Sequence, residues 1–158
     1  MDIVIPYIKA FFTNYLLVSA MLGWLFAQII KVFTGLYQRR NMGFFKILFS
    51  TGGMPSSHSS TVVALSTAAA FQEGLDSPIF AVCAILSMVV MIDASGVRYE
   101  TGKQAVLLNK ISREIFSGDT ELMNSGLKEL VGHTPFQVVM GALLGLGIGI
   151  AMYFVMMR

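Results

Sequence analysis

Two long apolar segments limit what this chain can fold into. Tyr15 to Tyr37 and Pro135 to Met157 are each 23 residues long, and the second contains no charged residue. A helix needs about 20 mostly apolar residues to cross a hydrocarbon core of roughly 30 Å. Both segments therefore predict transmembrane helices.

Two shorter apolar segments complete the predicted bundle. Residues 57–72 and 78–92 flank the acidic turn EGLDSP, a pattern typical of an antiparallel pair of short or tilted helices. With 158 residues, 55% of them hydrophobic and 13% charged, the chain has room for a single membrane domain, 1–158. We therefore predict an all-α integral membrane helical bundle with about four transmembrane helices, near 15–37, 57–72, 78–92 and 135–157.

Two further segments are suited to the membrane interface. Asn41 to Ser50 is apolar but too short to cross, and Lys103 to Phe116 mixes apolar residues with charged ones, as an amphipathic helix does. The first segment is expected to lie at the interface or to re-enter the membrane, and the second to lie as an interfacial helix on the polar side of the bundle, with membrane lipids as neighbours. The formal net charge of +2 is too small to indicate a nucleic-acid partner.

The basic residues are distributed unevenly between the two predicted sides. Nine of the eleven fall in or beside the two long polar segments, and only Lys9 and Arg158 fall on the other side. The positive-inside rule then places both termini outside the cell membrane and the polar segments in the cytoplasm.

Polar residues gather where three predicted spans reach the cytoplasmic side. GGMPSSHSS places Ser56, Ser57 and His58 at a helix start, where a serine can cap the helix and free backbone N–H groups can bind an anion. MIDASGVRYETGKQA places Asp93 at the membrane edge, with Arg98 and Lys103 beyond it as candidate phosphate ligands.

The two histidines of the chain both lie at predicted helix starts on this side. His133 precedes Thr134 and Pro135, as His58 follows Pro55. Two imidazoles beside cations can carry out phosphoryl transfer through a phosphohistidine, a reaction that needs no cofactor. Metal binding is the weaker interpretation, because His58 and His133 lack a local cluster of Asp, Glu or Cys at ligand spacing.

The same motifs resemble a known superfamily. PSSH, ending at His58, is similar to the PSGH signature of the type 2 phosphatidic acid phosphatases and vanadium-dependent haloperoxidases. HTPFQVVMGALLG, starting at His133, resembles their third signature, and the chain from about residue 20 to 150 is similar to the divergent membrane branch. The resemblance implies that His133 is the nucleophile, that His58 is the general acid, and that Ser57 and nearby backbone amides hold phosphate.

The most serious departure from the superfamily pattern lies at one position. Gln137 stands where an aspartate would orient the nucleophilic histidine. An amide can fix a tautomer but stabilises an imidazolium less than a carboxylate does. We expect Gln137 to orient His133, with Asp93 or Glu129 as the candidate source of the missing charge. The alternative role of Asp93 is an ion pair with Arg98 or Lys31.

These residues predict a lipid-phosphate phosphatase that acts at the cytoplasmic interface on a lipid phosphate or diphosphate. The alternative is a catalytically inactive protein that binds or transports phosphorylated lipids, and vanadate-dependent halide oxidation is a third option. Glycines repeat every four residues at Gly141, Gly145 and Gly149, which predicts either close helix packing or a homo-oligomer. The predicted catalytic residues are His133, His58 and Asp93, and the predicted phosphate ligands are Lys31, Ser56, Ser57, Arg98 and Lys103.

Overall fold

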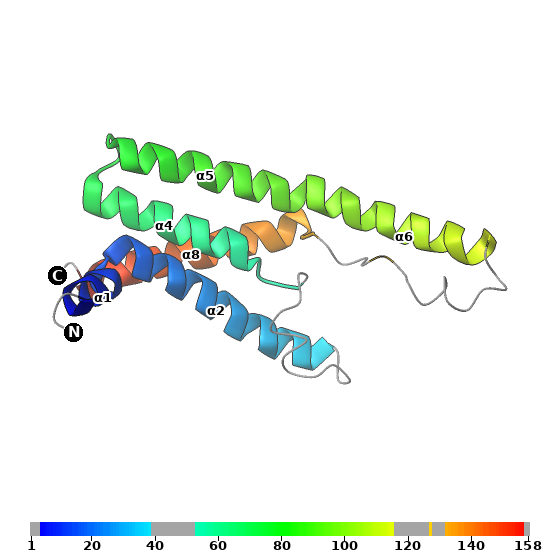
Figure 1. Ribbon diagram of the computed structural model, residues 1–158, viewed down its shortest axis with the longest axis horizontal. Coiled ribbons are helices and arrows are strands. Elements are labelled where there is room, and N and C mark those ends of the chain that lie inside the picture. The colour runs from blue at the N-terminus through cyan, green and yellow to red at the C-terminus, as the bar shows by residue number, and fades with distance from the viewer. Residues whose placement is uncertain (1–3, 39–52, 116–126, 128–131, 157–158) are drawn as a thin grey trace.

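The computed structural model describes residues 4–38, 53–115, 127 and 132–156, and every regular element in these ranges is a helix (Figure 1). The helices are α1 (Val4–Thr13), α2 (Tyr15–Gln38), α4 (Ser57–Glu73), α5 (Pro78–Ser95), α6 (Val97–Ile115) and α8 (Pro135–Met156). The predicted all-α membrane bundle is confirmed, and the four predicted spans match α2, α4, α5 and α8 to within three residues. The interfacial segment predicted at 41–50 lies outside the described residues.

Three stretches of helix are long and apolar enough to cross a membrane. They are Tyr15–Thr34 in α2, Pro78–Ile115 through α5 and α6, and Pro135–Met156 in α8. The fourth predicted span, α4, has 17 residues and a more polar sequence. It lies beside α5 for its whole length (Figure 1) and packs against α2, α5 and α8, so the neighbouring helices provide its apolar surroundings.

Side-chain caps account for where these helices begin. The Asn14 side chain accepts a hydrogen bond from the Leu17 backbone N–H at 3.0 Å, which starts α2 after the break that ends α1. Ser77 accepts from the Phe80 N–H at 3.1 Å, and Pro78 occupies the first turn of α5. Each cap satisfies a backbone donor that has no partner within its helix.

Small residues allow α4 to lie at the centre of the bundle. Ala64 and Ala68 of α4 are completely buried, and glycines on both neighbouring helices face α4. A Cβ atom at Gly23 of α2 would lie 2.8 Å from the Ser60 carbonyl oxygen, and one at Gly145 of α8 would lie 2.4 Å from the same atom. The backbones of three helices therefore approach one another through positions that tolerate only glycine.

The glycine repeat of α8 is used for packing within the chain. Gly141, Gly145 and Gly149 are all buried, and each faces a residue of α4. This is the close-packing alternative of the sequence analysis. The homo-oligomer stays a prediction, and a second copy would have to use a surface other than this repeat.

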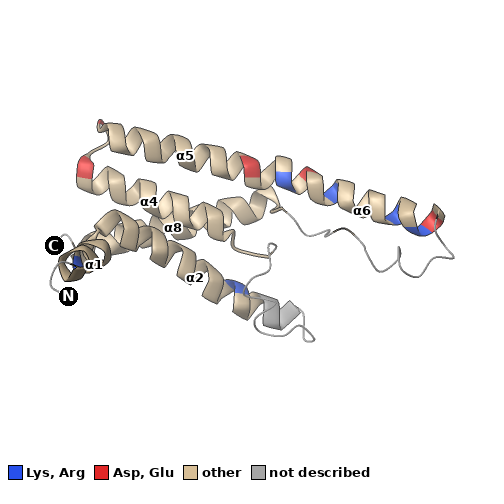
Figure 2. Cartoon of the chain, in the orientation of Figure 1, with Lys and Arg blue, Asp and Glu red and all other residues tan. Residues whose placement is uncertain are grey.

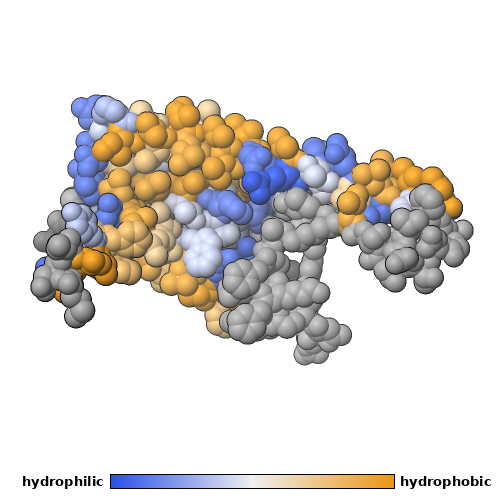
Figure 3. Space-filling model, viewed as in Figure 1, coloured by the Kyte–Doolittle hydropathy of each residue, from blue (hydrophilic) through white to orange (hydrophobic). Residues whose placement is uncertain are grey.

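The α6 helix continues from α5 after a break at Gly96 and extends beyond the rest of the bundle (Figure 1). It begins at Val97, six residues before the amphipathic segment predicted at Lys103. The charged residues lie mostly along α6 and at its junction with α5, while the middle of the bundle has few (Figure 2). The space-filling view shows the same contrast, with a hydrophobic surface over α5 and a hydrophilic patch at the junction (Figure 3).

The helix ends sort into two groups. Both chain ends and the turn between α4 and α5 lie at one end of the bundle, while the start of α4, the end of α5 and the start of α8 lie toward the other (Figure 1). The segments that carry His58, Asp93 and His133 are therefore brought together, as the sequence predicts.

Candidate functional site

The two histidines face each other where α4 and α8 begin. His58 lies in the first turn of α4 and is exposed, while His133 lies two residues before α8 and is only 3% exposed. Their ring centroids are 6.2 Å apart. Both imidazoles are close enough to contact one phosphoryl group, with His133 on its buried side and His58 on its open side.

Backbone hydrogen bonds hold the helix ends around this pair. The Ser56 N–H donates to the Gln137 carbonyl oxygen at 3.1 Å, which ties the start of α4 to the first turn of α8. The His133 N–H donates to the Ala94 carbonyl oxygen at 3.1 Å, which ties the segment before α8 to the end of α5. These bonds fix the position of His133 relative to both neighbouring helices.

Gln137 orients His133 and caps α8 at the same time. Its Oε1 atom accepts a hydrogen bond from the Thr134 backbone N–H at 3.1 Å, and Thr134 Oγ1 accepts from the Gln137 N–H at 3.4 Å. This reciprocal pair is a capping box. The same Oε1 lies 3.3 Å from His133 Nδ1. Because Oε1 can only accept, Nδ1 is the donor, and Nε2 is left as the nitrogen that can attack phosphorus.

Burial is the largest influence on the charge of His133, and it lowers the pKa of the imidazole below its usual 6.5. The hydrogen bond with Gln137 opposes this shift, the charges of Lys31 and His58 add to it, and a backbone hydrogen bond at Gly53 opposes it. The net result is a lowered pKa, so His133 is neutral at pH 7. A neutral imidazole is the form required of a nucleophile.

Lys31 brings a buried positive charge from α2 to the same place. Its residue is 3% exposed, and its side-chain stem packs on Gly53, where an added Cβ would lie 3.3 Å from Lys31 Cγ. Lys31 acts electrostatically on both histidines. Within the part of the chain that the structure describes, Lys31 forms no ion pair. An unpaired buried ammonium is costly, which makes this position suited to an anion.

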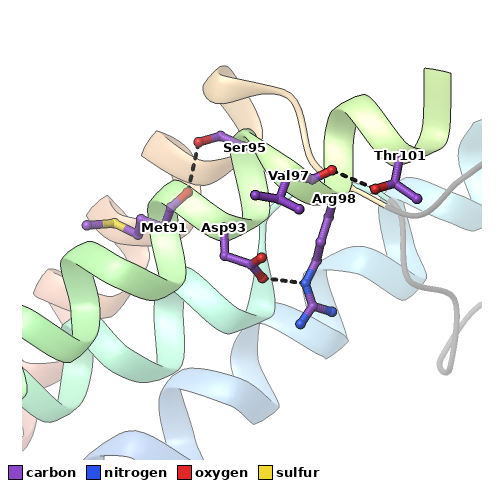
Figure 4. Close-up of polar contacts among 6 residues, drawn as sticks. All are labelled: Met91, Asp93, Ser95, Val97, Arg98 and Thr101. Carbon is purple, nitrogen blue, oxygen red and sulfur yellow. Dashed lines mark hydrogen bonds and ion pairs between the residues drawn. The ribbon is translucent and has the colours of Figure 1, made fainter. Parts of the chain in front are cut away.

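Asp93 and Arg98 form an ion pair across the junction of α5 and α6 (Figure 4). Arg98 Nε donates to Asp93 Oδ2 at 2.5 Å, and both side chains remain partly exposed. Both charges act on His58. Of the two alternatives for Asp93, this geometry corresponds to the ion pair, and Gln137 contacts His133 instead. A direct catalytic role of Asp93 stays a prediction.

The remaining predicted phosphate ligands differ in their surroundings. The Ser56 hydroxyl is completely buried and bonds the N–H and hydroxyl of Ser59, so it caps α4. Ser57 is buried beside His58, and its hydroxyl makes no hydrogen bond within the described ranges. Lys103 is held on α6 by Glu100 at 2.8 Å and by the Tyr99 ring. Glu129, the other candidate charge, lies outside the described residues.

Sequence reasoning missed two features of this site. Thr134 and Gln137 match the Thr-x-x-Gln pattern of a capping box, so their pairing was visible in the sequence. Gly132 had no such signal. A Cβ there would lie 2.3 Å from the Tyr99 backbone nitrogen, so the segment before His133 passes directly over the first turn of α6. Among the described residues, no three His, Cys, Asp or Glu side chains form a group that could hold a metal ion.

Comparison with known proteins agrees with the resemblance noted from the motifs. Residues 12–148 match the Divergent PAP2 family. The chain is also 40% identical over 144 residues to the uncharacterized membrane protein YuiD of Bacillus subtilis (strain 168), an alignment that covers 85% of this chain and 90% of that relative. No solved structure matches the chain. The family match spans most of the sequence and includes both histidines, so this chain belongs to the Divergent PAP2 family.

Proposed function

We propose that this membrane protein is a lipid-phosphate phosphatase that acts through a phosphohistidine on His133. The observation that carries the proposal is the pairing of a buried, neutral His133 with an exposed His58 at 6.2 Å, beside the positive charge of the buried Lys31. Membership of the Divergent PAP2 family supports a phosphatase-related role.

In the first step, the Nε2 lone pair of His133 attacks phosphorus, and the bond between phosphorus and the lipid oxygen breaks. His58 in its protonated form, which the negative charge of a bound phosphate favours, donates its proton to that oxygen, so the lipid leaves as an alcohol, or as a monophosphate if the substrate is a diphosphate. Because His58 lies on the open side, the lipid leaves toward the exposed face.

In the second step, water attacks the phosphoryl group on His133. Neutral His58 removes a proton from this water, the bond between phosphorus and nitrogen breaks, and inorganic phosphate is released. His133 returns to its neutral form and His58 to its protonated form, so the cycle needs only water and the protein's own side chains.

Positive charge and N–H donors stabilise the phosphoryl oxygens during both steps. Lys31 supplies a buried charge, Arg98 supplies a second that acts on His58, and the first turn of α4 offers the backbone N–H of Ser57. Arg98 is paired with Asp93, but its charge still acts on His58, whereas Lys103 is held by Glu100 and is not among the charges that act on either histidine, so we place Lys103 outside this group.

The neutral Gln137 favours the alternative function, a protein that binds or transports phosphorylated lipids without hydrolysis. With no carboxylate at Nδ1, the imidazolium that forms during turnover is less stabilised than in an enzyme with an aspartate. Transport through the bundle would require α4 to separate from Gly23 and Gly145, where the helix backbones meet. Lipid binding is therefore the stronger form of this alternative.

The orientation in the membrane is part of the proposal. We place the histidines in the cytoplasmic half of the cell membrane and both termini outside, which favours a substrate made on the cytoplasmic leaflet. In a Cys83→Ser background, a cysteine introduced in a Gln38→Cys variant should be shielded from an impermeant thiol reagent in intact cells. Labelling in intact cells would show that the protein has the opposite orientation.

The direct test is phosphate release by the purified protein from phosphatidic acid, phosphatidylglycerophosphate and a polyprenyl diphosphate. We expect release from at least one of them, and its loss in His133→Ala and His58→Ala. Phe136→Ala is the control, because Phe136 is next to the site in sequence but 63% exposed. Activity that survives in His133→Ala would make the nucleophile assignment wrong, and a silent wild type that still binds these lipids would favour the binding alternative.

A further inference from the structure

Among the described residues, helix packing closes one side of the histidine pair and leaves the other side open. His133 is 97% buried, and behind it α4 and α8 are closed together at Gly141 and Gly145, where no Cβ would fit. His58 is the exposed member of the pair. Within this part of the chain, the open approach to His133 is therefore the face of α4 that carries His58.

That face of α4 lies between two helices that do not meet. α2 and α5 both pack on α4, yet within the described residues they make no contact with each other (Figure 1). Leu65 is seven residues after His58, which places it on the same face of α4 and about 10.5 Å further into the bundle. Leu65 is only partly buried, so this face remains accessible beyond the histidine.

The flanking helices repeat this arrangement at the same depth. Trp24 is seven residues before Lys31 on α2, and Leu86 is seven residues before Asp93 on α5. Each therefore shares a helix face with a residue whose charge acts on His58, and each lies about 10.5 Å further along its helix into the bundle. Trp24 and Leu86 are both 44% exposed. Below the charged layer of His58, Lys31 and Asp93 lies an apolar layer of Leu65, Trp24 and Leu86.

We propose that the hydrocarbon tail of the substrate lies over Leu65, between Trp24 and Leu86. The proposal rests on the proposed function, because it takes the phosphate of the same lipid to be at His58 and His133. It makes these three residues determinants of chain-length specificity.

The chemistry of the two layers favours a lipid tail over other occupants. The deeper layer is apolar and partly exposed, and it lies on the membrane-embedded side of the site, where hydrocarbon is the surrounding solvent. A water-soluble phosphate without a hydrocarbon tail would gain no binding energy from this apolar layer. A tail that starts at the phosphate and leaves on the His58 side reaches this layer while staying in lipid.

The test compares a long-chain lipid phosphate with a short-chain, water-soluble one in wild type, Leu65→Trp and Leu86→Trp. In both variants we expect kcat/KM for the long chain to fall about tenfold relative to the short chain, because contact with about two methylene groups is lost. Leu143→Trp is the control, since Leu143 is 56% exposed on the far side of α8 from Gly141 and Gly145. It should keep the wild-type ratio. If Leu65→Trp and Leu86→Trp also keep that ratio, the tail lies elsewhere.

A second measurement works without turnover and separates this proposal from the proposed function. A phosphatidic acid with a photoactivatable group in its tail should cross-link to peptides from α4 or α5, and Leu65→Trp should reduce that labelling. A matching phosphatidylcholine should label the outer surface without this preference. Equal labelling by both lipids would overturn the tail position, whether or not the protein hydrolyses phosphate. Selective labelling by a protein that releases no phosphate would keep the tail position and reject only catalysis.

Discussion

Gly141→Ala should disturb the site through a single added methyl group. The Cβ atom would lie 2.3 Å from the Ser56 carbonyl oxygen and 3.0 Å from Ser59 Cβ. Ordinary contact begins near 3.4 Å, so the two backbones would have to separate by about 1 Å. Ser56 caps α4 two residues before His58, so this separation moves one histidine relative to the other.

The expected magnitude has a stability part and an activity part. Overpacking of this kind costs about 1–3 kcal/mol in the free energy of unfolding. A misplacement of about 1 Å between reacting groups can reduce the rate by about 100-fold. We therefore expect Gly141→Ala to lose activity more strongly than its modest loss of stability would explain.

Gly147→Ala is the matched control on the same helix, because a Cβ there meets nothing within 4 Å. It should leave activity unchanged and stabilise the helix by about 0.5–1 kcal/mol, the difference between glycine and alanine in a helix interior. Thermal unfolding in detergent and phosphate release measure both effects. The claim that close packing at Gly141 holds the histidine pair in place is refuted if Gly141→Ala matches the wild type in both assays, or if Gly147→Ala is the more damaging change.

Three further changes have defined outcomes. Gln137→Glu places a carboxylate at His133 Nδ1, which raises the pKa of His133. The acid limb of the pH–rate profile should therefore move to higher pH. An acid limb at the wild-type pH would contradict the contact between Gln137 and His133. Lys31→Met removes a buried charge, so KM should rise about 10- to 100-fold while the midpoint of thermal unfolding stays the same or increases. A lower midpoint with an unchanged KM would contradict phosphate binding by Lys31. Because the pKa of His133 is lowered in the folded state, the unfolded chain binds its proton more readily. Stability should therefore fall as pH drops through about 6.5, and His133→Asn should weaken that dependence in thermal melts at pH 7.5 and 5.5.

The sequence was sufficient to predict the helices that cross the membrane. Segment length and hydropathy located α2 and α8, because the bilayer imposes one requirement on every span. The shorter α4 and α5 were found as a pair from the acidic turn between them. The α1 helix was missed, since ten residues are too few for a spanning pattern.

The candidate site was predicted in its residues but not in its contacts. Helix polarity alone brings the starts of α4 and α8 and the end of α5 to one side, so His58, His133 and Asp93 were expected together. Which of them touch depends on non-local packing at Gly132, Gly141 and Gly145, which no local pattern encodes. The partner of His133 could have been predicted from the capping box that Thr134 and Gln137 form.

The phosphohistidine that we propose on His133 can be trapped in the protein. Wild type and His58→Ala would be mixed with a hydrolysable lipid phosphate, quenched in alkali to preserve phosphohistidine, and digested for mass spectrometry. We predict a phosphorylated peptide that contains His133, because it lies at the buried end of the pair and Gln137 holds its Nδ1. The same peptide should be unmodified in His133→Asn. Phosphate release at an unchanged rate from His133→Asn, or phosphorylation of His58 in its place, would contradict the mechanism.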